Sequence, residues 1–125
     1  MTGSQGVVSD PERPRTVLVA EDEALIRLDL VEMLGELGYQ VIAEASDGQQ
    51  AVDLARALHP DLVFLDVAMP VRDGLSAAEE ISSLALAPVV MVTAFGQRES
   101  VERATAAGVM GYLVKPFTQI GRAHV

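Results

Sequence analysis

The sequence contains no cysteine, which excludes a disulfide framework and any metal site built on thiolates. It also lacks an apolar stretch long enough to span a bilayer, and its N-terminus lacks a basic region followed by an apolar one. Neither a membrane helix nor a signal peptide is therefore indicated. Because the absence of cysteine is compatible with a reducing compartment, we expect a cytoplasmic protein that does not bind membranes.

Positive charge is also scarce in this chain. Lysine and arginine number 9 against 18 aspartates and glutamates, which gives a formal net charge of -9 and a pI near 4.5. Phosphate backbones are bound by clustered lysine and arginine, so this composition argues against direct nucleic-acid binding by the chain. The acidity instead favours cations or basic proteins as partners.

What the chain does have is a regular alternation of short apolar runs with helical patterns. At 125 residues, half of them hydrophobic, it can form one domain with a real core. We expect a disordered leader over 1–14 and the domain over 15–118. Strands are predicted at 16–20, 40–44, 61–65, 88–92 and 109–114, and helices at 25–37, 48–58, 76–84 and 98–107. This pattern predicts an α/β fold, a doubly wound five-stranded parallel sheet of flavodoxin-like order 2-1-3-4-5.

Polar residues follow the predicted strands. Glu21 and Asp22 come after the first strand, Asp66 after the third, Thr93 after the fourth and Lys115 after the fifth. In such sheets, ligands bind outside the carboxyl ends of the strands. Carboxylates that meet there repel one another unless a cation intervenes, and Mg²⁺ suits a site of carboxylates, water and phosphoryl oxygens. We therefore predict that Asp66 is an ionised nucleophile for phosphoryl transfer, assisted by Mg²⁺, Thr93 and Lys115.

Each of these residues also has an ordinary structural interpretation when taken alone. An acidic cluster is favourable at a helix N-terminus, and Asp66 could belong to a loop before a proline-containing turn. Thr93 could be a cap and Lys115 a solvated lysine. The functional interpretation is favoured because all of them end different predicted strands and their chemistry is complementary.

Four spaced motifs run along most of the chain: Val-Leu-Val-Ala-Glu-Asp-Glu, Leu-Asp-Val-Ala-Met-Pro-Val-Arg-Asp-Gly, Val-Thr-Ala and Gly-Tyr-Leu-Val-Lys-Pro-Phe. Together they resemble the receiver domain of a two-component response regulator, over about 16–118. The resemblance implies that Asp66 accepts a phosphoryl group from a sensor histidine kinase. It also implies a signalling switch with self-catalysed phosphotransfer rather than a turnover enzyme.

The same resemblance implies a metal site. Glu21, Asp22 and Asp66 would bind Mg²⁺, or alternatively Mn²⁺, together with the backbone carbonyl of Ala68. Glu21 stands where aspartate is more usual, so its longer side chain is expected to change the water arrangement at the ion. Ala68 and Phe95 lie two residues after Asp66 and Thr93, and neither side chain can bind an attacking water. We therefore predict slow loss of the phosphate.

The remaining roles implied by the resemblance concern the switch. Thr93 and Lys115 would contact the phosphoryl oxygens, and Tyr112 would be the switch aromatic that turns inward when Thr93 shifts. The bond between Lys115 and Pro116 is expected to be cis. Phosphorylation would then change the surface around helix 98–107 and strand 109–114 by shifting an existing equilibrium.

Two other classes of protein were weighed against this interpretation. A pseudo-receiver would act only as a protein-interaction module, which the set Asp22, Asp66, Thr93 and Lys115 disfavours. A phosphatase of the haloacid dehalogenase type would have a second aspartate two residues after its nucleophile, where this chain has Ala68.

The end of the sequence differs from the receiver pattern. After Thr118 the chain is too short for the expected fifth helix, so we expect that helix to be missing or truncated and 119–125 not to be native. Three segments, Ala-Glu-Asp-Glu-Ala-Leu-Ile-Arg, Thr-Ala-Phe-Gly-Gln-Arg-Glu and Tyr-Leu-Val-Lys-Pro-Phe, resemble those of actinobacterial regulators whose output is an ANTAR domain, a helical RNA-binding antiterminator. The full-length protein is therefore expected to continue into an output domain that controls transcription antitermination.

Overall fold

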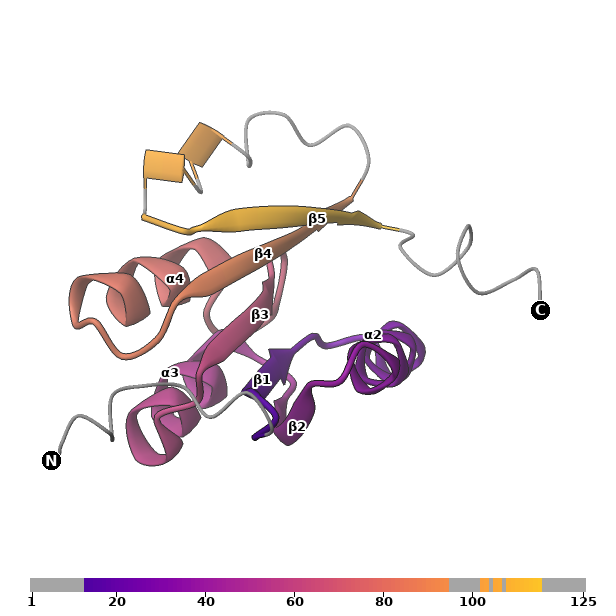
Figure 1. The fold of residues 1–125 in the computed structure, drawn as a ribbon. Helices are drawn as coiled ribbons and strands as arrows, with labels where there is room; N and C mark the ends of the chain where they lie inside the picture. Colours follow the sequence, from indigo (N-terminus) through magenta and orange to yellow (C-terminus); the bar gives the residue numbers. More distant parts are fainter. Residues whose placement is uncertain (1–12, 95–101, 104, 107, 116–125) are drawn as a thin grey trace, which may run out of the picture.

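The computed structural model describes residues 13–94, 102, 103, 105, 106 and 108–115, and strands alternate with helices from residue 16 to residue 94. The elements are β1 (Thr16–Ala20), α2 (Ala24–Glu36), β2 (Gln40–Ala45), α3 (Gly48–Leu58), β3 (Leu62–Asp66), α4 (Gly74–Ser83), β4 (Val89–Ala94) and β5 (Gly111–Lys115). All strand pairs are parallel and the sheet order is β2-β1-β3-β4-β5 (Figure 1). The predicted fold class is confirmed.

The sheet is covered on both faces. Helix α2 packs on one face, whereas α3 and α4 pack on the other (Figure 1). Strand β1 shows the division, because successive side chains of a strand point to opposite faces. Leu18 and Ala20 belong to the cluster with α3 and α4, and Val17 and Val19 belong to the cluster with α2. All of them are fully buried, as expected of a central parallel strand.

The core on the α3 and α4 face is rich in alanine. Ala51 and Ala55 of α3 and Ala77 and Ala78 of α4 are buried in it. These small side chains allow the helices to approach the sheet closely, and the larger Ile81 fills space beside them.

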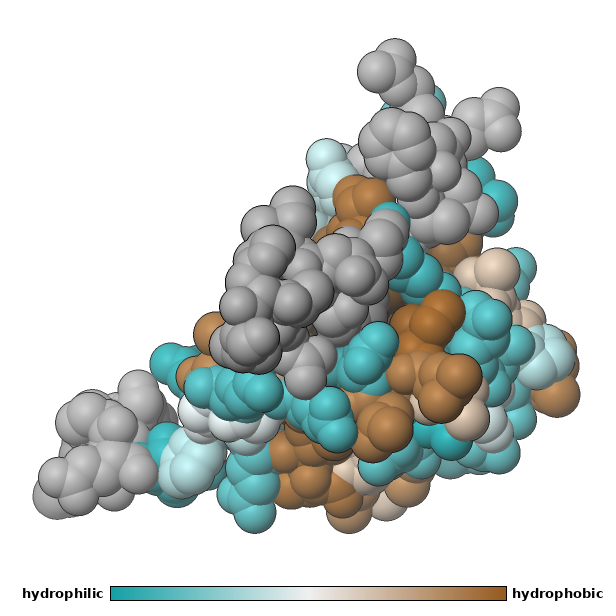
Figure 2. Space-filling model, turned by 90° about the vertical axis from the view of Figure 1, so that its right-hand side faces the viewer, coloured by the Kyte–Doolittle hydropathy of each residue, from teal (hydrophilic) through white to brown (hydrophobic). Residues whose placement is uncertain are grey.

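The opposite face carries exposed leucines on and next to α2, at Leu25, Leu28 and Leu37, and its surface mixes polar with apolar areas (Figure 2).

Helices α3 and α4 begin in the same way. Asp47 and Asp73 are their N-caps, and each carboxylate accepts a 2.8 Å hydrogen bond, from the backbone N–H of Gln50 and of Ser76 respectively. Each cap is followed by a buried glycine. By contrast, α2 begins after Glu23 without a side-chain cap. None of the described helices is long and apolar enough to cross a membrane.

Several element boundaries differ from the sequence prediction. Asp66 and Lys115 are the last residues of β3 and β5 rather than the first residues after them, and β4 extends through Thr93. The reason is pairing with neighbouring strands, which continues past the apolar run: Thr93 pairs with Val114. Helix α4 starts at Gly74, two residues earlier than predicted, because Asp73 caps it.

Some expectations lie outside the described residues. These are the leader apart from 13 and 14, most of helix 98–107, the fifth-helix region and the tail 119–125.

Candidate functional site

The carboxyl edge of the sheet gathers the charged residues. Ala20, the last residue of β1, pairs with Leu65, so the residues that follow them, Glu21 and Asp66, lie level with each other. On the other side, Asp66 pairs with Val92 of β4. Strand β5 completes the row by placing Lys115 at this edge.

Lys115 binds two buried carboxylates at once. Its Nζ lies 3.0 Å from Oε1 of Glu21 and 3.1 Å from Oδ1 of Asp66, and 4.0 Å from the more exposed Glu23. The side chain of Glu21 is fully buried and that of Asp66 is 6% exposed. Burying these charges without a cation would be very costly, so the ammonium stabilises the cluster.

The pKa values show that one ammonium does not fully compensate the acidic groups. Burial, reinforced by repulsion from Glu21, raises the pKa of Asp66 to about 6 despite the opposing effect of Lys115. Burial also raises the pKa of Glu21. Although burial itself acts to lower the pKa of Lys115, its hydrogen bond to Glu21 and the charge of Asp66 raise it overall. An additional cation is therefore favoured at this edge.

The oxygens available to such a cation are close together. One carboxylate oxygen each from Glu21, Asp22 and Asp66 lies within 4.8 Å of the others. Asp22 is exposed, which leaves an open side toward solvent. In Glu21, Oε2 accepts a 3.1 Å hydrogen bond from the N–H of Glu23, whereas the buried Oε1 is contacted only by the Lys115 ammonium among the described residues. This donor set of hard carboxylate oxygens fits Mg²⁺.

The loop between β3 and α4 turns back tightly over the end of β3. The N–H of Gly74 donates to the carbonyl of Val67 at 2.8 Å, and a Cβ at Gly74 would collide with the backbone carbonyl of Asp66. Val71 has a φ of 67° and is 83% exposed, a backbone conformation unusual for a β-branched residue. This loop contains Ala68, which is exposed next to the acidic cluster in sequence.

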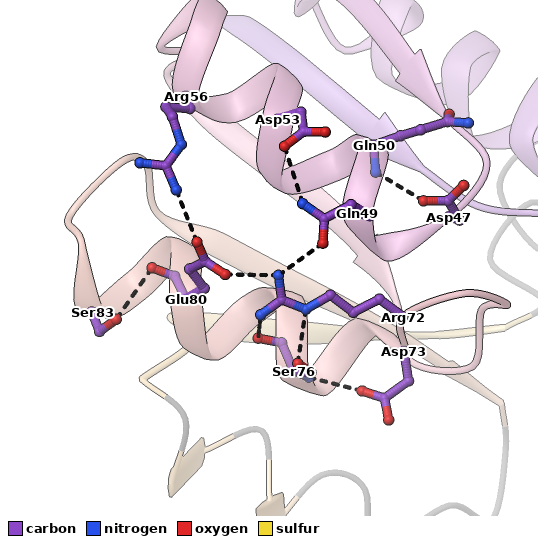
Figure 3. Close-up of polar contacts among 10 residues, drawn as sticks. All are labelled: Asp47, Gln49, Gln50, Asp53, Arg56, Arg72, Asp73, Ser76, Glu80 and Ser83. Atoms are coloured by element: carbon purple, nitrogen blue, oxygen red, sulfur yellow. Dashed lines mark hydrogen bonds and ion pairs between the residues drawn. The ribbon is translucent and has the colours of Figure 1, made fainter.

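Arg72 connects this loop to two helices. Its guanidinium donates to the Ser76 hydroxyl at 2.9 Å and pairs with Glu80 at 2.7 Å, and it reaches Gln49 of α3 at 3.4 Å (Figure 3). Glu80 also pairs with Arg56 of α3 at 2.8 Å. The backbone contributes as well, since the carbonyl of Arg72 accepts a 3.0 Å hydrogen bond from Gly48.

Comparison with known proteins agrees with this geometry. Residues 17–121 match the response regulator receiver domain. The chain belongs to this family. It is 61% identical over 110 residues to the transcriptional regulatory protein PdtaR of Mycobacterium tuberculosis, covering 88% of this chain and 54% of that protein. The receiver domain thus spans about half the length of this relative.

Other relatives match this chain over most of their own length. The chemotaxis protein CheY of Bacillus subtilis is 39% identical over 102 residues, covering 81% of this chain and 85% of that protein. A crystal structure of the CheX–CheY–BeF₃–Mg²⁺ complex of Borrelia burgdorferi matches with a TM-score of 0.80 at 28% identity, covering 92% of this chain and 88% of that one.

The receiver domain brings together most of the residues singled out from the sequence. Glu21, Asp22, Asp66 and Lys115 lie in one cluster. Thr93 is 1% exposed and lies near the end of β4, one residue beyond the partner of Asp66. These placements agree with the predicted site, whereas the roles of the residues stay predictions.

Tyr112 lies on β5. Tyr112 pairs with Met91, so by strand alternation its side chain shares a sheet face with Thr93, and it is 52% exposed. Pro116 and Phe95 lie outside the described residues.

Sequence reasoning missed the two arginines that hold the site loops. Arg72 binds Ser76 and Glu80 of α4, and Arg27 donates to the backbone carbonyl of Glu21 at 2.7 Å. Arg72 stands inside the motif around Asp66, but nothing in the motif indicated its partners. They come from other elements of the receiver domain.

Proposed function

We propose that residues 15–118 form a phosphoacceptor domain in which Asp66 takes a phosphoryl group from a sensor histidine kinase. The observation that carries the proposal is the setting of the Asp66 carboxylate. It is buried at the end of β3, lies 3.1 Å from the Lys115 ammonium and shares an acidic cluster with Glu21 and Asp22. A structural ion pair would require no such excess of carboxylates.

The reaction follows from these groups. An oxygen of the Asp66 carboxylate attacks the phosphorus of a phosphohistidine; the new O–P bond forms as the P–N bond breaks, and the imidazole leaves with the bonding electrons and takes a proton from solvent. A pKa of about 6 leaves most of the Asp66 carboxyl ionised at neutral pH, as a nucleophile must be. Lys115 and the Thr93 hydroxyl would then bind the phosphoryl oxygens.

Glu21, Asp22, Asp66 and the backbone carbonyl of Ala68 would hold Mg²⁺, with Mn²⁺ as the alternative ion. When bound, the ion supplies positive charge between the carboxylates and the phosphoryl oxygens. The fully buried carboxylate of Glu21, whose Oε1 contacts only the Lys115 ammonium among the described residues, supports this assignment. So does the Mg²⁺ in the matching Borrelia complex.

The signal would pass along the face shared by Thr93 and Tyr112. If Thr93 moves toward the phosphoryl group, the exposed Tyr112 gains space to turn inward, and the surface around β5 and helix 98–107 changes. Ala68 offers only a methyl group to an attacking water, which supports slow dephosphorylation. The domain would thus act as a switch and not as a turnover enzyme.

The output would be transcriptional control in the cytoplasm. The M. tuberculosis relative is named a transcriptional regulatory protein and is about twice as long as the matched region. We propose an RNA-binding antitermination domain as the output of the full-length protein, while this acidic domain itself binds no nucleic acid. The remaining alternative is a pseudo-receiver that only binds other proteins.

The test is intact-mass spectrometry after incubation with acetyl phosphate, with and without Mg²⁺. The chain is expected to gain one phosphoryl group only with Mg²⁺, and Asp66→Asn is expected to gain none. Asp53→Asn is a matched control, because it neutralises an exposed carboxylate on α3 and should leave the gain unchanged.

Circular dichroism of each sample shows whether it is folded. A folded, unmodified wild-type chain would refute phosphorylation and favour the pseudo-receiver. A gain that persists in Asp66→Asn would assign the phosphoryl group to another residue.

A further inference from the structure

Arg27 contacts the acidic end of β1 from the first turns of α2. Its guanidinium donates to the backbone carbonyl of Glu21 at 2.7 Å and to the carboxylate of Glu44 on β2 at 2.9 Å. The Arg27 side chain is only 23% exposed, while that of Glu44 is 50% exposed. One side chain therefore joins the loop after β1 to both α2 and β2.

The carbonyl that Arg27 binds belongs to the peptide unit between Glu21 and Asp22. Because a peptide unit is planar, fixing the direction of this carbonyl also fixes the direction in which Asp22 leaves the strand. The N–H of Glu21 is held by the carbonyl of Ala45 at 3.0 Å. The N–H of Glu23 is held by Oε2 of Glu21 at 3.1 Å. These two bonds do not fix the peptide unit between Glu21 and Asp22, and Arg27 holds that unit through its carbonyl.

We propose that Arg27 is a positioning residue of the metal site, which orients the carboxylates of Glu21 and Asp22 through the peptide between them. The proposal builds on the Mg²⁺ site put forward above. Outer groups that orient metal ligands typically change metal affinity by 10- to 100-fold when they are removed. We expect a loss of Mg²⁺ affinity near the lower end of this range, because Asp66 ends β3, Ala68 lies in the loop after it, and neither is held by Arg27.

A direct effect of charge would have the opposite sign. A nearby guanidinium repels Mg²⁺, so replacing it with an apolar side chain would strengthen binding if charge were its main influence. Loss of positioning would weaken binding instead. The direction of the change in Mg²⁺ affinity therefore separates the two roles.

The main variant is chosen to hold the net charge near the site constant. The double variant Arg27→Leu with Glu44→Gln removes both members of the ion pair and leaves the net charge near the site unchanged. Glu44→Gln alone removes the ion pair but keeps the hydrogen bond from Arg27 to Glu21. Arg27→Lys retains a donor and a charge and should restore part of the affinity.

The measurement is isothermal titration of the full chain with MgCl₂, at a temperature where thermal unfolding shows every variant to be folded. The double variant is expected to bind Mg²⁺ about tenfold more weakly than the unsubstituted chain. Glu44→Gln is expected to change the Kd by less than about twofold, because an exposed ion pair contributes little. At saturating Mg²⁺, phosphorylation by acetyl phosphate should proceed at a rate within about threefold of the original, since the ligands themselves remain.

Three results would overturn the inference in distinguishable ways. Unchanged or tighter Mg²⁺ binding by the folded double variant would refute the positioning role while leaving the Mg²⁺ site in place. Absence of Mg²⁺ binding by the unsubstituted chain would refute the metal site, and the role of Arg27 with it. A lower melting temperature with unchanged Kd would show that Arg27 only joins α2 to β2.

Discussion

The loop after β1 and the loop after β3 both border the acidic cluster, but different forces hold them. The first is short: Glu21, Asp22 and Glu23 lead directly into α2, which has no side-chain cap. It is fixed by hydrogen bonds to its backbone, among them the one from Arg27. Its contribution to the site consists of carboxylates on side chains.

The loop after β3, residues 67–73, contributes a backbone carbonyl, that of Ala68, in the proposed site. A carbonyl can be aimed only by shaping the chain itself, and this loop is shaped by close contact. Gly74 lies against the backbone of Asp66, Val71 has a positive φ, and Asp73 caps α4. The comparison teaches that hydrogen bonds to the backbone can hold a loop that offers side-chain ligands, whereas a loop that offers a backbone ligand is shaped by steric contact.

The most severe way to break the second loop is Gly74→Ala. The new Cβ would collide with the carbonyl of Asp66, which is backbone and cannot move aside. We expect the free energy of unfolding to fall by about 3 kcal/mol or more, measured by urea denaturation. Gly35→Ala in α2 is the control: nothing lies within 4 Å of its Cβ, so a gain of up to about 1 kcal/mol is expected. Equal effects of the two substitutions would contradict the close contact.

A second test concerns the carboxylate that both loops surround. The pKa of Asp66 is raised from 3.8 to about 6 in the folded protein, so the folded state holds this proton more tightly than the unfolded state. Without metal, the contribution of Asp66 to stability should therefore be complete below pH 3.8 and be lost as the pH rises from there through about 6. The loss is up to about 3 kcal/mol, from 1.36 kcal/mol for each pKa unit.

The comparison that isolates Asp66 is with Asp66→Asn, in EDTA, at pH 5 and pH 7.5. Because Glu21 also has a raised pKa, the variant should retain a smaller pH dependence and be more stable than the original chain at pH 7.5. The same pH dependence in both proteins would show that Asp66 does not titrate as described. Added Mg²⁺ should stabilise the original chain at pH 7.5 and have less effect on the variant.

A third test removes the arginine of the second loop. Arg72→Met should lower the free energy of unfolding by about 1 kcal/mol, because it removes a partly buried ion pair with Glu80 and two hydrogen bonds to Ser76. Arg56→Met is the matched control, since Arg56 pairs with the same Glu80 but its side chain is 54% exposed. We expect less than about 0.5 kcal/mol for the control. A larger loss of stability in Arg56→Met than in Arg72→Met would show that Arg56 makes the more stabilising contact with Glu80.

The smallest expected effect comes from Val71. Its side chain is exposed, so replacing it loses little packing, and asparagine tolerates a positive φ better than valine. Val71→Asn should therefore stabilise the domain by about 0.5 to 1 kcal/mol in urea denaturation. Val71→Ala lacks the polar side chain that lets asparagine adopt this conformation and should give a smaller gain. Destabilisation by asparagine would indicate that a contact of the valine side chain stabilises the domain by more than the positive φ destabilises it.

Much of the fold could be predicted from the sequence, because its signals are local. Alternating β-branched runs and helical spacings defined the elements, the rules for parallel crossovers indicated a parallel sheet, and five strands suited the flavodoxin-like order 2-1-3-4-5 that is observed. The same rules placed Glu21, Asp66 and Lys115 at one edge before any contact was known. Strand ends were less certain, since Asp66 and Thr93 are included in strands by pairing with neighbours and not by their own apolarity.

The sequence by itself thus determined the architecture and the set of acidic and basic residues at the carboxyl edge. The tertiary structure decided how those residues are held: Lys115 between two buried carboxylates, Arg27 on the carbonyl of Glu21, and Gly74 against Asp66. Periodicity reports which face a residue occupies, but contacts such as these join residues from separate elements. They depend on distances that exist only after the sheet and its helices have packed together.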